Sequence, residues 1–287
     1  MSASKRKSSA AAAQPSTNKR SKAPVAVSSA SAAQAEAEHD AAASPFLAPA
    51  ALWRSRSLPE WRRHADAYAD GRALAASFAL RKSRPAAVDS VAEYRRLDRT
   101  ASGALNGAAS VSRAQLLDII NWKHTRGKLR PNYGKVAQNA PAAVEAATAA
   151  AFAYLVANPA INTSTKAKAS TKASGADEGS DDEIDEDETE TRHVAHALDL
   201  LSKPLHGVGP ATASAVLAAA HPERCAFASD DLLALALRGR KPAYAAAEVT
   251  IASAALRAKA ARMQHAIAIG EMERALFAAA MLHRPSA

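Results

Sequence analysis

The stretch that decides the expected fold is LLSKPLHGVGPATASAVL, residues 200–217. An apolar helix is expected to end at Pro204, and Pro210 suits the first turn of a second helix, because that turn does not use the amide hydrogen that proline lacks. Gly207 and Gly209 permit a tight turn between them, since glycine adopts backbone angles that other residues avoid. The stretch therefore predicts two helices joined by a glycine-rich turn.

The same turn is a candidate ligand site. Successive backbone N–H groups at a helix N-terminus suit a phosphate oxygen, and the positive end of the helix dipole adds to that preference. Glycine leaves no side chain between the backbone and a ligand. The alternative is an ordinary glycine-rich turn between two helices.

The pattern Leu-x-Gly-Val-Gly-Pro-Ala-Thr-Ala, residues 205–213, resembles the helix-hairpin-helix motif. This resemblance implies a contact with the DNA backbone that does not read sequence. The residues that it assigns to backbone binding are Gly207, Val208, Gly209 and Thr212.

The segment that follows extends the resemblance. Phe227-Ala-Ser-Asp230-Asp231 is similar to the alkylated-base branch of the helix-hairpin-helix DNA glycosylases. That likeness implies a catalytic carboxylate, Asp230 or Asp231, which stabilises an oxocarbenium-like sugar or activates water as a flipped base leaves. Ala211 stands where lyase-active members carry a lysine, which argues against Schiff-base chemistry by that route. Alternatively, either aspartate caps a helix that begins near Leu232.

A second cluster runs from Trp122 to Tyr133 and reads WKHTRGKLRPNY. Basic side chains interleaved with aromatic ones suit phosphates and a stacked base. The candidate nucleic-acid contacts are Trp122, Lys123, Arg126, Lys128 and Arg130. The alternative places Trp122 in the core and the cations on a solvated last turn ending at Gly127, which the helix dipole also favours.

Together with the hairpin, this Trp-Lys…Arg-Gly-Lys…Arg-Pro block resembles a fungal helix-hairpin-helix protein family of unsettled activity. That resemblance covers most of residues 50–155 and 191–285, whereas the likeness to glycosylases covers mainly 197–235. The resemblance to the fungal family implies a fold more than a function.

Helical signals dominate elsewhere, and strand signals are scarce. Ser112 and Gln115 form the expected capping box of one helix, and Pro141 is expected in the first turn of another. The class predicted is all-α, an orthogonal, DNA glycosylase-like helical bundle. Further helices are expected around residues 60–81, 193–202, 210–221, 230–238, 244–262 and 264–283.

Charge is distributed unevenly along the 287 residues, whose net charge is +9. Residues 177–190 hold 10 of the 28 acidic residues, which leaves 18 against 37 Lys and Arg in the rest of the chain. A basic body of this kind favours a polyanionic partner. We expect duplex DNA, bound with little regard to sequence.

Two segments have the composition of disordered chain. Residues 1–45 form a basic tail, and 161–190 form an insertion rich in Ser, Thr and Lys that becomes acidic. They would leave 46–160 and 191–287 as the two parts of the folded domain. The acidic run would mimic nucleic acid and shield the basic surface, bind basic chromatin proteins such as histones, or merely solubilise the chain.

The tail carries two basic clusters that resemble a bipartite nuclear import signal, so a nuclear location is expected. The alternative is a basic tail that adds non-specific affinity. The clusters comprise Lys5, Arg6 and Lys7, then Lys19, Arg20 and Lys22.

The single cysteine, Cys225, excludes a disulfide framework, a four-cysteine zinc site and a cysteine-ligated iron–sulfur cluster. No run of residues is apolar enough for a membrane span. We expect no metal, no cofactor and no membrane partner, and a monomer. The function expected is DNA binding in nuclear repair or chromatin; the alternative is a monofunctional DNA glycosylase.

Overall fold

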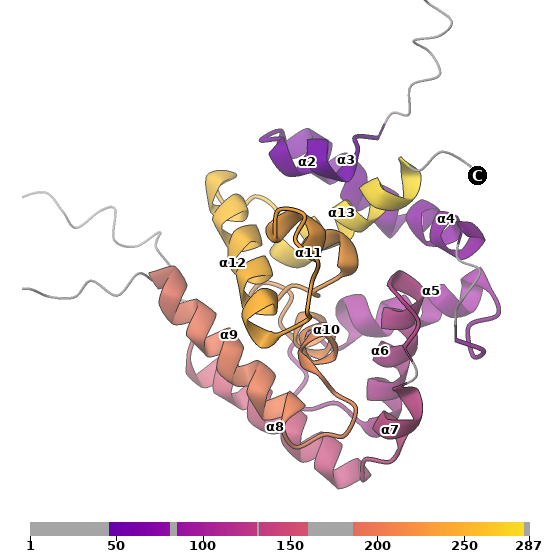
Figure 1. The fold of residues 1–287 in the computed structure, drawn as a ribbon, viewed down its shortest axis with the longest axis vertical. Helices are drawn as coiled ribbons and strands as arrows, with labels where there is room; N and C mark the ends of the chain where they lie inside the picture. The colour runs from indigo at the N-terminus through magenta and orange to yellow at the C-terminus, as the bar shows by residue number, and fades with distance from the viewer. Residues whose placement is uncertain (1–45, 81–84, 131, 160–185, 284–287) are drawn as a thin grey trace, which may run out of the picture. The chain divides into compact units, whose positions relative to one another are not determined.

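Helices account for all the regular structure of the described residues (Figure 1). This confirms the all-α class. The basic tail, residues 1–45, and residues 161–185 of the insertion lie outside the described part, together with the expectations attached to them. The computed structural model describes residues 46–80, 85–130, 132–159 and 186–283.

The N-terminal part divides into more helices than its sequence predicts. The single helix expected over 60–81 is two, because the chain turns at Gly71, whose φ of +84° lies in the left-handed region open to glycine. The elements here are α2 (Pro49–Arg54), α3 (Leu58–Ala69), α4 (Arg72–Leu80), α5 (Val91–Arg99) and the π-helix η1 (Thr100–Ala104).

The next helices begin where local signals place them. The Ser112 hydroxyl accepts a hydrogen bond from the Gln115 backbone N–H, and the Gln115 side-chain oxygen accepts one from the Ser112 backbone N–H, which confirms the capping box. Pro141 is the first residue of its helix, also as predicted. These elements are α6 (Arg113–Arg126), α7 (Tyr133–Ala137) and α8 (Pro141–Ala157).

The helix before the hairpin begins earlier than expected. The acidic insertion was predicted to extend to residue 190, but α9 starts at Glu186. Acidic residues in a first turn are favoured by the helix dipole. In addition, the buried Glu190 carboxylate pairs with Arg224 at 2.7 Å. The C-terminal elements are α9 (Glu186–Ser202), α10 (Pro210–Ala220), α11 (Asp230–Ala236), α12 (Ala246–Arg262) and α13 (Ile269–Leu282).

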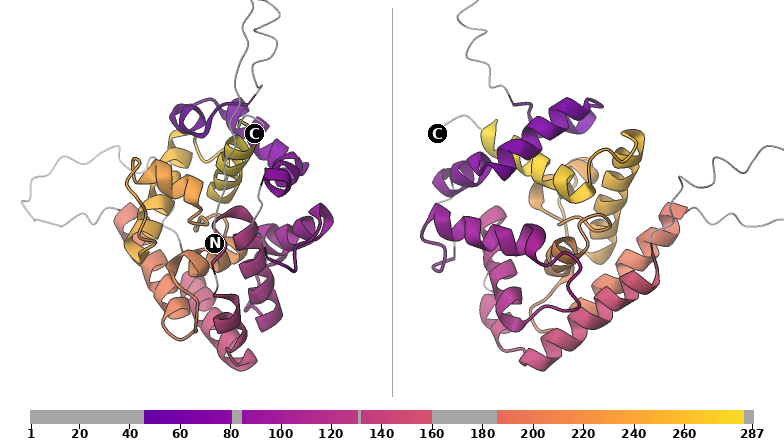
Figure 2. Two further views of the ribbon diagram at one scale, coloured as in Figure 1. Left: turned by 45° about the vertical axis from the view of Figure 1, so that its right-hand side comes forward. Right: turned by 180° about the vertical axis from the view of Figure 1, so that it is seen from behind.

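Both parts of the chain contribute to one core. α8 lies alongside α9, and α13 packs against α2, α3 and α4, so that helices far apart in sequence are neighbours (Figures 1 and 2). One cluster of buried apolar residues includes Leu52 and Trp61 near its start and Leu276 and Phe277 near its end. Folding of either part therefore depends on the other.

Cys225 lies in this core, as a structural thiol would. It is buried, and burial raises the pKa of the thiol to about 12. A thiol that stays protonated at neutral pH is a poor nucleophile.

Candidate functional site

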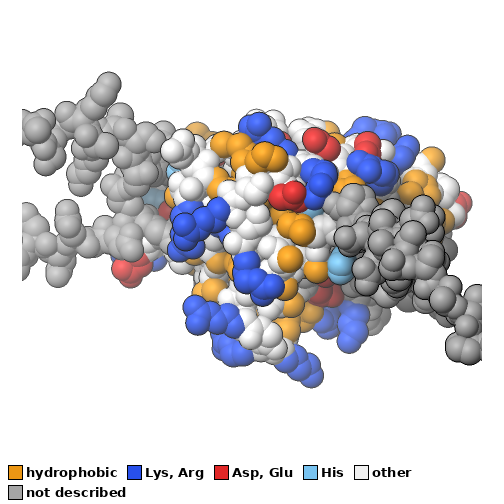
Figure 3. Space-filling view, turned by 90° about the horizontal axis from the view of Figure 1, so that it is seen from above, with side chains coloured by type: hydrophobic (Ala, Val, Ile, Leu, Met, Phe, Trp, Pro, Cys, Tyr) orange, Lys and Arg blue, Asp and Glu red, His pale blue; other side chains and the backbone are white. Residues whose placement is uncertain are grey.

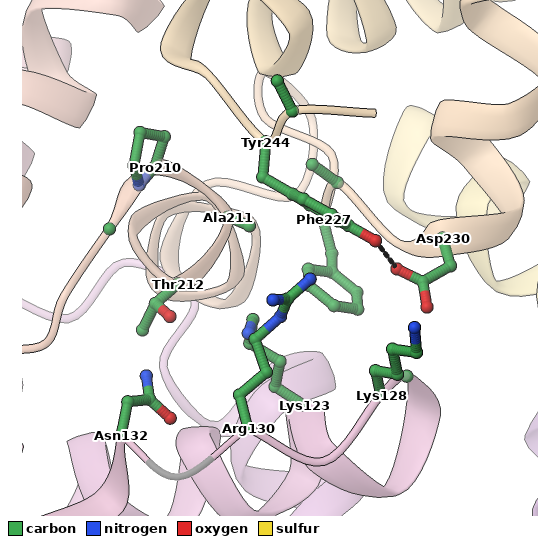
Figure 4. A pocket seen from close by; sticks show the side chains of 14 residues that line it. Lys123, Lys128, Arg130, Asn132, Pro210, Ala211, Thr212, Phe227, Asp230 and Tyr244 are labelled. Atoms are coloured by element: carbon green, nitrogen blue, oxygen red, sulfur yellow. Dashed lines mark hydrogen bonds between the residues drawn. The ribbon is translucent and has the colours of Figure 1, made fainter. Parts of the chain in front are cut away.

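The hairpin and the 122–133 cluster meet at one pocket of about 250 Å³ (Figure 4). It lies among the loop after α6, the N-terminus of α10 and the chain before α12. We call it the hairpin pocket. Its principal lining residues are Lys123, Lys128, Arg130 and Asn132 from the first cluster, Gly209, Pro210, Ala211 and Thr212 from the hairpin, and Phe227, Asp230 and Tyr244.

The N-terminus of α10 gives the pocket backbone donors. Gly209 is the N-cap and Pro210 the first helical residue, as the sequence predicts. The Thr212 backbone N–H donates to the Gly209 carbonyl at 2.8 Å. The backbone N–H groups of Gly209 and Ala211, in contrast, have no hydrogen-bond acceptor among the described residues. A Cβ at Gly209 would meet nothing within 4 Å. This end of the hairpin is open to a ligand.

The other end of the turn, at Gly207 and Val208, has no room for a further side chain at Gly207. Gly207 has a φ of +75°, and a Cβ there would lie 2.9 Å from the Lys135 Cβ. Val208 is buried, and its N–H donates to the Leu205 carbonyl at 3.3 Å. Gly207 is thus required by the turn and by contact with α7, while the Val208 N–H is already bonded within the turn.

Two asparagines that the sequence does not single out hold this turn. The Asn132 side-chain amide donates to the Gly207 carbonyl at 3.0 Å. Asn139 donates to the His206 carbonyl at 2.9 Å and accepts from the His206 N–H at 2.8 Å. Isolated asparagines in loops give no pattern that would have identified them. Together they fix the hairpin to the chain around α7.

Three cations face the open end of the hairpin. Lys123 is half-buried; burial lowers the pKa of its ammonium, the charge of Arg130 lowers it further, and Asp230 opposes both effects. The Arg130 guanidinium lies over the Tyr244 ring, 4.8 Å from its centroid. Lys128 is exposed and projects from the same loop (Figure 4). One carboxylate, Asp230, lines the pocket with them.

Trp122 and Arg126 do not belong to this surface, which corrects their assignment as nucleic-acid contacts. Trp122 is buried, and its indole N–H donates to Asp98 at 2.8 Å. Arg126 is 1% exposed and forms two hydrogen bonds, of 2.9 and 2.8 Å, to the Glu273 carboxylate. Both residues serve the core, as the alternative interpretation held for Trp122.

The two aspartates differ in position, and neither is the helix cap. Ser229 caps α11, since its side chain accepts from the Leu232 amide. Asp230 lines the hairpin pocket and accepts a hydrogen bond of 2.7 Å from the Tyr244 hydroxyl (Figure 4). Asp231 does not line the pocket.

The arrangement can bind an anion, and it also places the Asp230 carboxylate in the same pocket. Free backbone N–H groups at a helix N-terminus, with three cations beside them, suit phosphate oxygens. No three His, Cys, Asp or Glu side chains of the described residues come together as a metal-binding group, and no helix among them is long and apolar enough to cross a bilayer. Comparison of the chain with protein-family models, with curated proteins and with solved structures finds no match.

Proposed function

We propose that this chain binds duplex DNA through a helix-hairpin-helix, formed by α9, the following turn and α10, which holds the phosphate backbone without reading the bases. The observation that carries the proposal is the convergence at the hairpin pocket. The free N–H groups of Gly209 and Ala211 lie at the same pocket as Lys123, Lys128 and Arg130.

These groups recognise charge rather than sequence. Backbone N–H donors and cations contact phosphate oxygens, which are alike at every base pair. Each phosphate neutralised releases condensed counterions, so the affinity should fall steeply as salt rises. The resemblance of residues 205–213 to the helix-hairpin-helix motif supports the same conclusion. Because the two basic clusters of the tail resemble a bipartite import signal, we also propose a nuclear role in repair or chromatin, with import through these clusters.

The test is the salt dependence of binding by the full chain. Fluorescence anisotropy with two labelled duplexes of unrelated sequence should give similar affinities and a linear fall of log K with log salt. Lys128→Gln with Arg130→Gln should reduce the slope by about 1.8, since each phosphate contact contributes about 0.9.

The matched control is Arg72→Gln with Arg99→Gln. It removes two exposed cations that line neither this pocket nor the one described below. It should leave the slope unchanged. Undetectable binding, or affinity independent of salt, would contradict the proposal.

A second candidate function is removal of a damaged base by a monofunctional DNA glycosylase. Asp230 favours it, because its carboxylate lines the hairpin pocket and is oriented by the Tyr244 hydroxyl at 2.7 Å. There it could activate the water that displaces a flipped base, or stabilise the developing sugar cation.

Base release from a panel of damaged duplexes tests this function. Asp230→Asn should lower the rate by at least about 100-fold, the usual contribution of such a group. Asp231→Asn is the matched control and should retain activity. No release from any lesion excludes this function and leaves the DNA-binding proposal unaffected, whereas release unaffected by Asp230→Asn excludes Asp230 as the responsible group.

A further inference from the structure

A second basic pocket, of about 440 Å³, lies at the opposite end of α11 from Asp230. Its walls come from the end of α2, the end of α11 and the C-terminal half of α12, and we call it the α2–α12 pocket. No Asp or Glu is among the described residues that line it. Five cations line it: Arg54, Arg56, Arg238, Lys259 and Arg262.

These cations have no counter-charge among the residues that the structure describes. Among the described residues, none of the five forms an ion pair with a carboxylate. Four are exposed, and Lys and Arg side chains gather on this face of the molecule (Figure 3). Like charges gathered in a concave surface repel one another and concentrate anions from solution.

Lys259 shows most clearly that the pocket is built around positive charge. Its ammonium lies 5.5 Å from the centroid of the Trp53 ring and 5.7 Å from that of Trp61, and it donates to the Ser55 carbonyl at 3.4 Å. Burial lowers its pKa, and the charges of Arg262 and Arg56 lower it further. An anion bound beside it would relieve that repulsion.

One short segment joins the two pockets. Arg238 lines the α2–α12 pocket, while Ala243 and Tyr244, a few residues on, line the hairpin pocket. Between them Arg240 and Lys241 are exposed. Basic side chains therefore continue along the chain from one pocket to the other.

We propose that the α2–α12 pocket is a second phosphate-binding site, which holds the backbone of the same DNA duplex as the hairpin pocket. The inference rests on the proposed function. The seven residues of α11 rise about 10 Å. A duplex presents a phosphate about every 3.4 Å along each strand, so roughly three phosphates of one strand cover that distance.

The experiment measures DNA affinity of the full chain carrying Arg238→Gln and Arg262→Gln. Both side chains are exposed and have no hydrogen bond or ion pair among the described residues, so the fold should be retained. The slope of log K against log salt should fall in magnitude by about 1.8. Raising the salt from 50 to 200 mM should therefore weaken binding by the variant roughly tenfold less than it weakens binding by the unmodified chain. The control with Arg72→Gln and Arg99→Gln should keep the original slope.

A second readout is specific to this pocket. Trp61 and Trp122 are buried, whereas Trp53 is partly exposed and lines the pocket. DNA should therefore change the tryptophan fluorescence of the chain, and Trp53→Phe should remove most of that change.

The outcomes separate this inference from the proposed function. If the Arg238/Arg262 variant keeps the slope of the unmodified chain while the Lys128/Arg130 variant lowers it, the hairpin pocket binds DNA and the second site is overturned. If the unmodified chain binds no DNA, both are overturned. A reduced slope in each variant, with the Trp53 signal, supports both sites.

Discussion

Arg126 and Arg130 lie four residues apart and have opposite surroundings. Arg126, on the last turn of α6, is 1% exposed and pairs with the buried Glu273. Its guanidinium also lies close to the faces of four aromatic rings, Tyr68, Trp122, Phe227 and Phe277. Arg130 is exposed at the hairpin pocket, beside other cations. α6 ends at Gly127 between them, and the change of direction there separates a cation that holds the fold from one available to a ligand.

The largest effect should come from breaking the buried pair. Arg126→Met leaves the Glu273 carboxylate buried without its partner, which should reduce the free energy of unfolding by about 3–5 kcal/mol. Urea denaturation measures it. Adding Glu273→Leu should recover much of the loss, because an apolar pair removes the uncompensated charge. A loss no larger than that of Arg130→Met would mean that Arg126 contributes little to the fold.

A smaller effect is expected from pH at the neighbouring His124. Burial lowers the pKa of its imidazole to about 4, with a further contribution from the Lys123 charge. The unfolded chain, with a histidine pKa of about 6.5, takes up this proton first, so stability should be lost as pH falls from about 6.5 to 4. The loss should reach about 3 kcal/mol.

Denaturation across this pH range, compared with that of His124→Gln, isolates the effect. The variant should show a weaker pH dependence. An identical dependence in the two proteins would show that another group is responsible.

The two glycines of the hairpin differ in the same way as the two arginines, since Gly207 is enclosed by the fold and Gly209 faces open space. Gly207→Ala would force a Cβ to within 2.9 Å of the Lys135 Cβ at a φ of +75°, which should cost about 2–3 kcal/mol of stability. Gly209→Ala enters open space at a φ of −86° and should cost less than about 1 kcal/mol. Thermal unfolding of the two variants compares them directly. Equal losses would contradict the distinction between a closed and an open end of the turn.

The smallest effect on stability belongs to the pocket cations. Lys128→Gln and Arg130→Gln should each change the free energy of unfolding by no more than about 0.5 kcal/mol, as is usual for exposed side chains. The same variants are those expected to weaken DNA binding. A loss of stability comparable to that of Arg126→Met would place them in the fold rather than at the binding site.

Local signals in the sequence predicted much of the fold. Three helix starts are marked by short local signals: the capping box at Ser112, and the prolines at 141 and 210. All three helices begin where these signals predict. Gly71 divides α3 from α4 through a backbone angle that a broad helical pattern does not reveal. Near the start of α9, Glu190 pairs with the distant Arg224, a contact that composition cannot show.

The candidate site was predictable in part for the same reason. The resemblance to glycosylases pointed to Asp230 and Asp231 without choosing between them, and of these Asp230 lines the same pocket as Gly209. The burial of Arg126 depends on Glu273, which lies 147 residues away in sequence. Asn132 and Asn139 act on a turn 67 to 75 residues later. Contacts over such separations are set by packing, and a single sequence contains no record of them.

The way the two halves interlock makes the chain a candidate for splitting. α13 packs against α2, α3 and α4, α8 lies along α9, and Arg126 pairs with Glu273 across the two parts. Fragments ending at residue 159 and beginning at 186 would each expose half of a shared core. Expressed separately they should aggregate, and expressed together they should assemble one to one, so the proposed DNA binding could be made conditional on the association of two polypeptides.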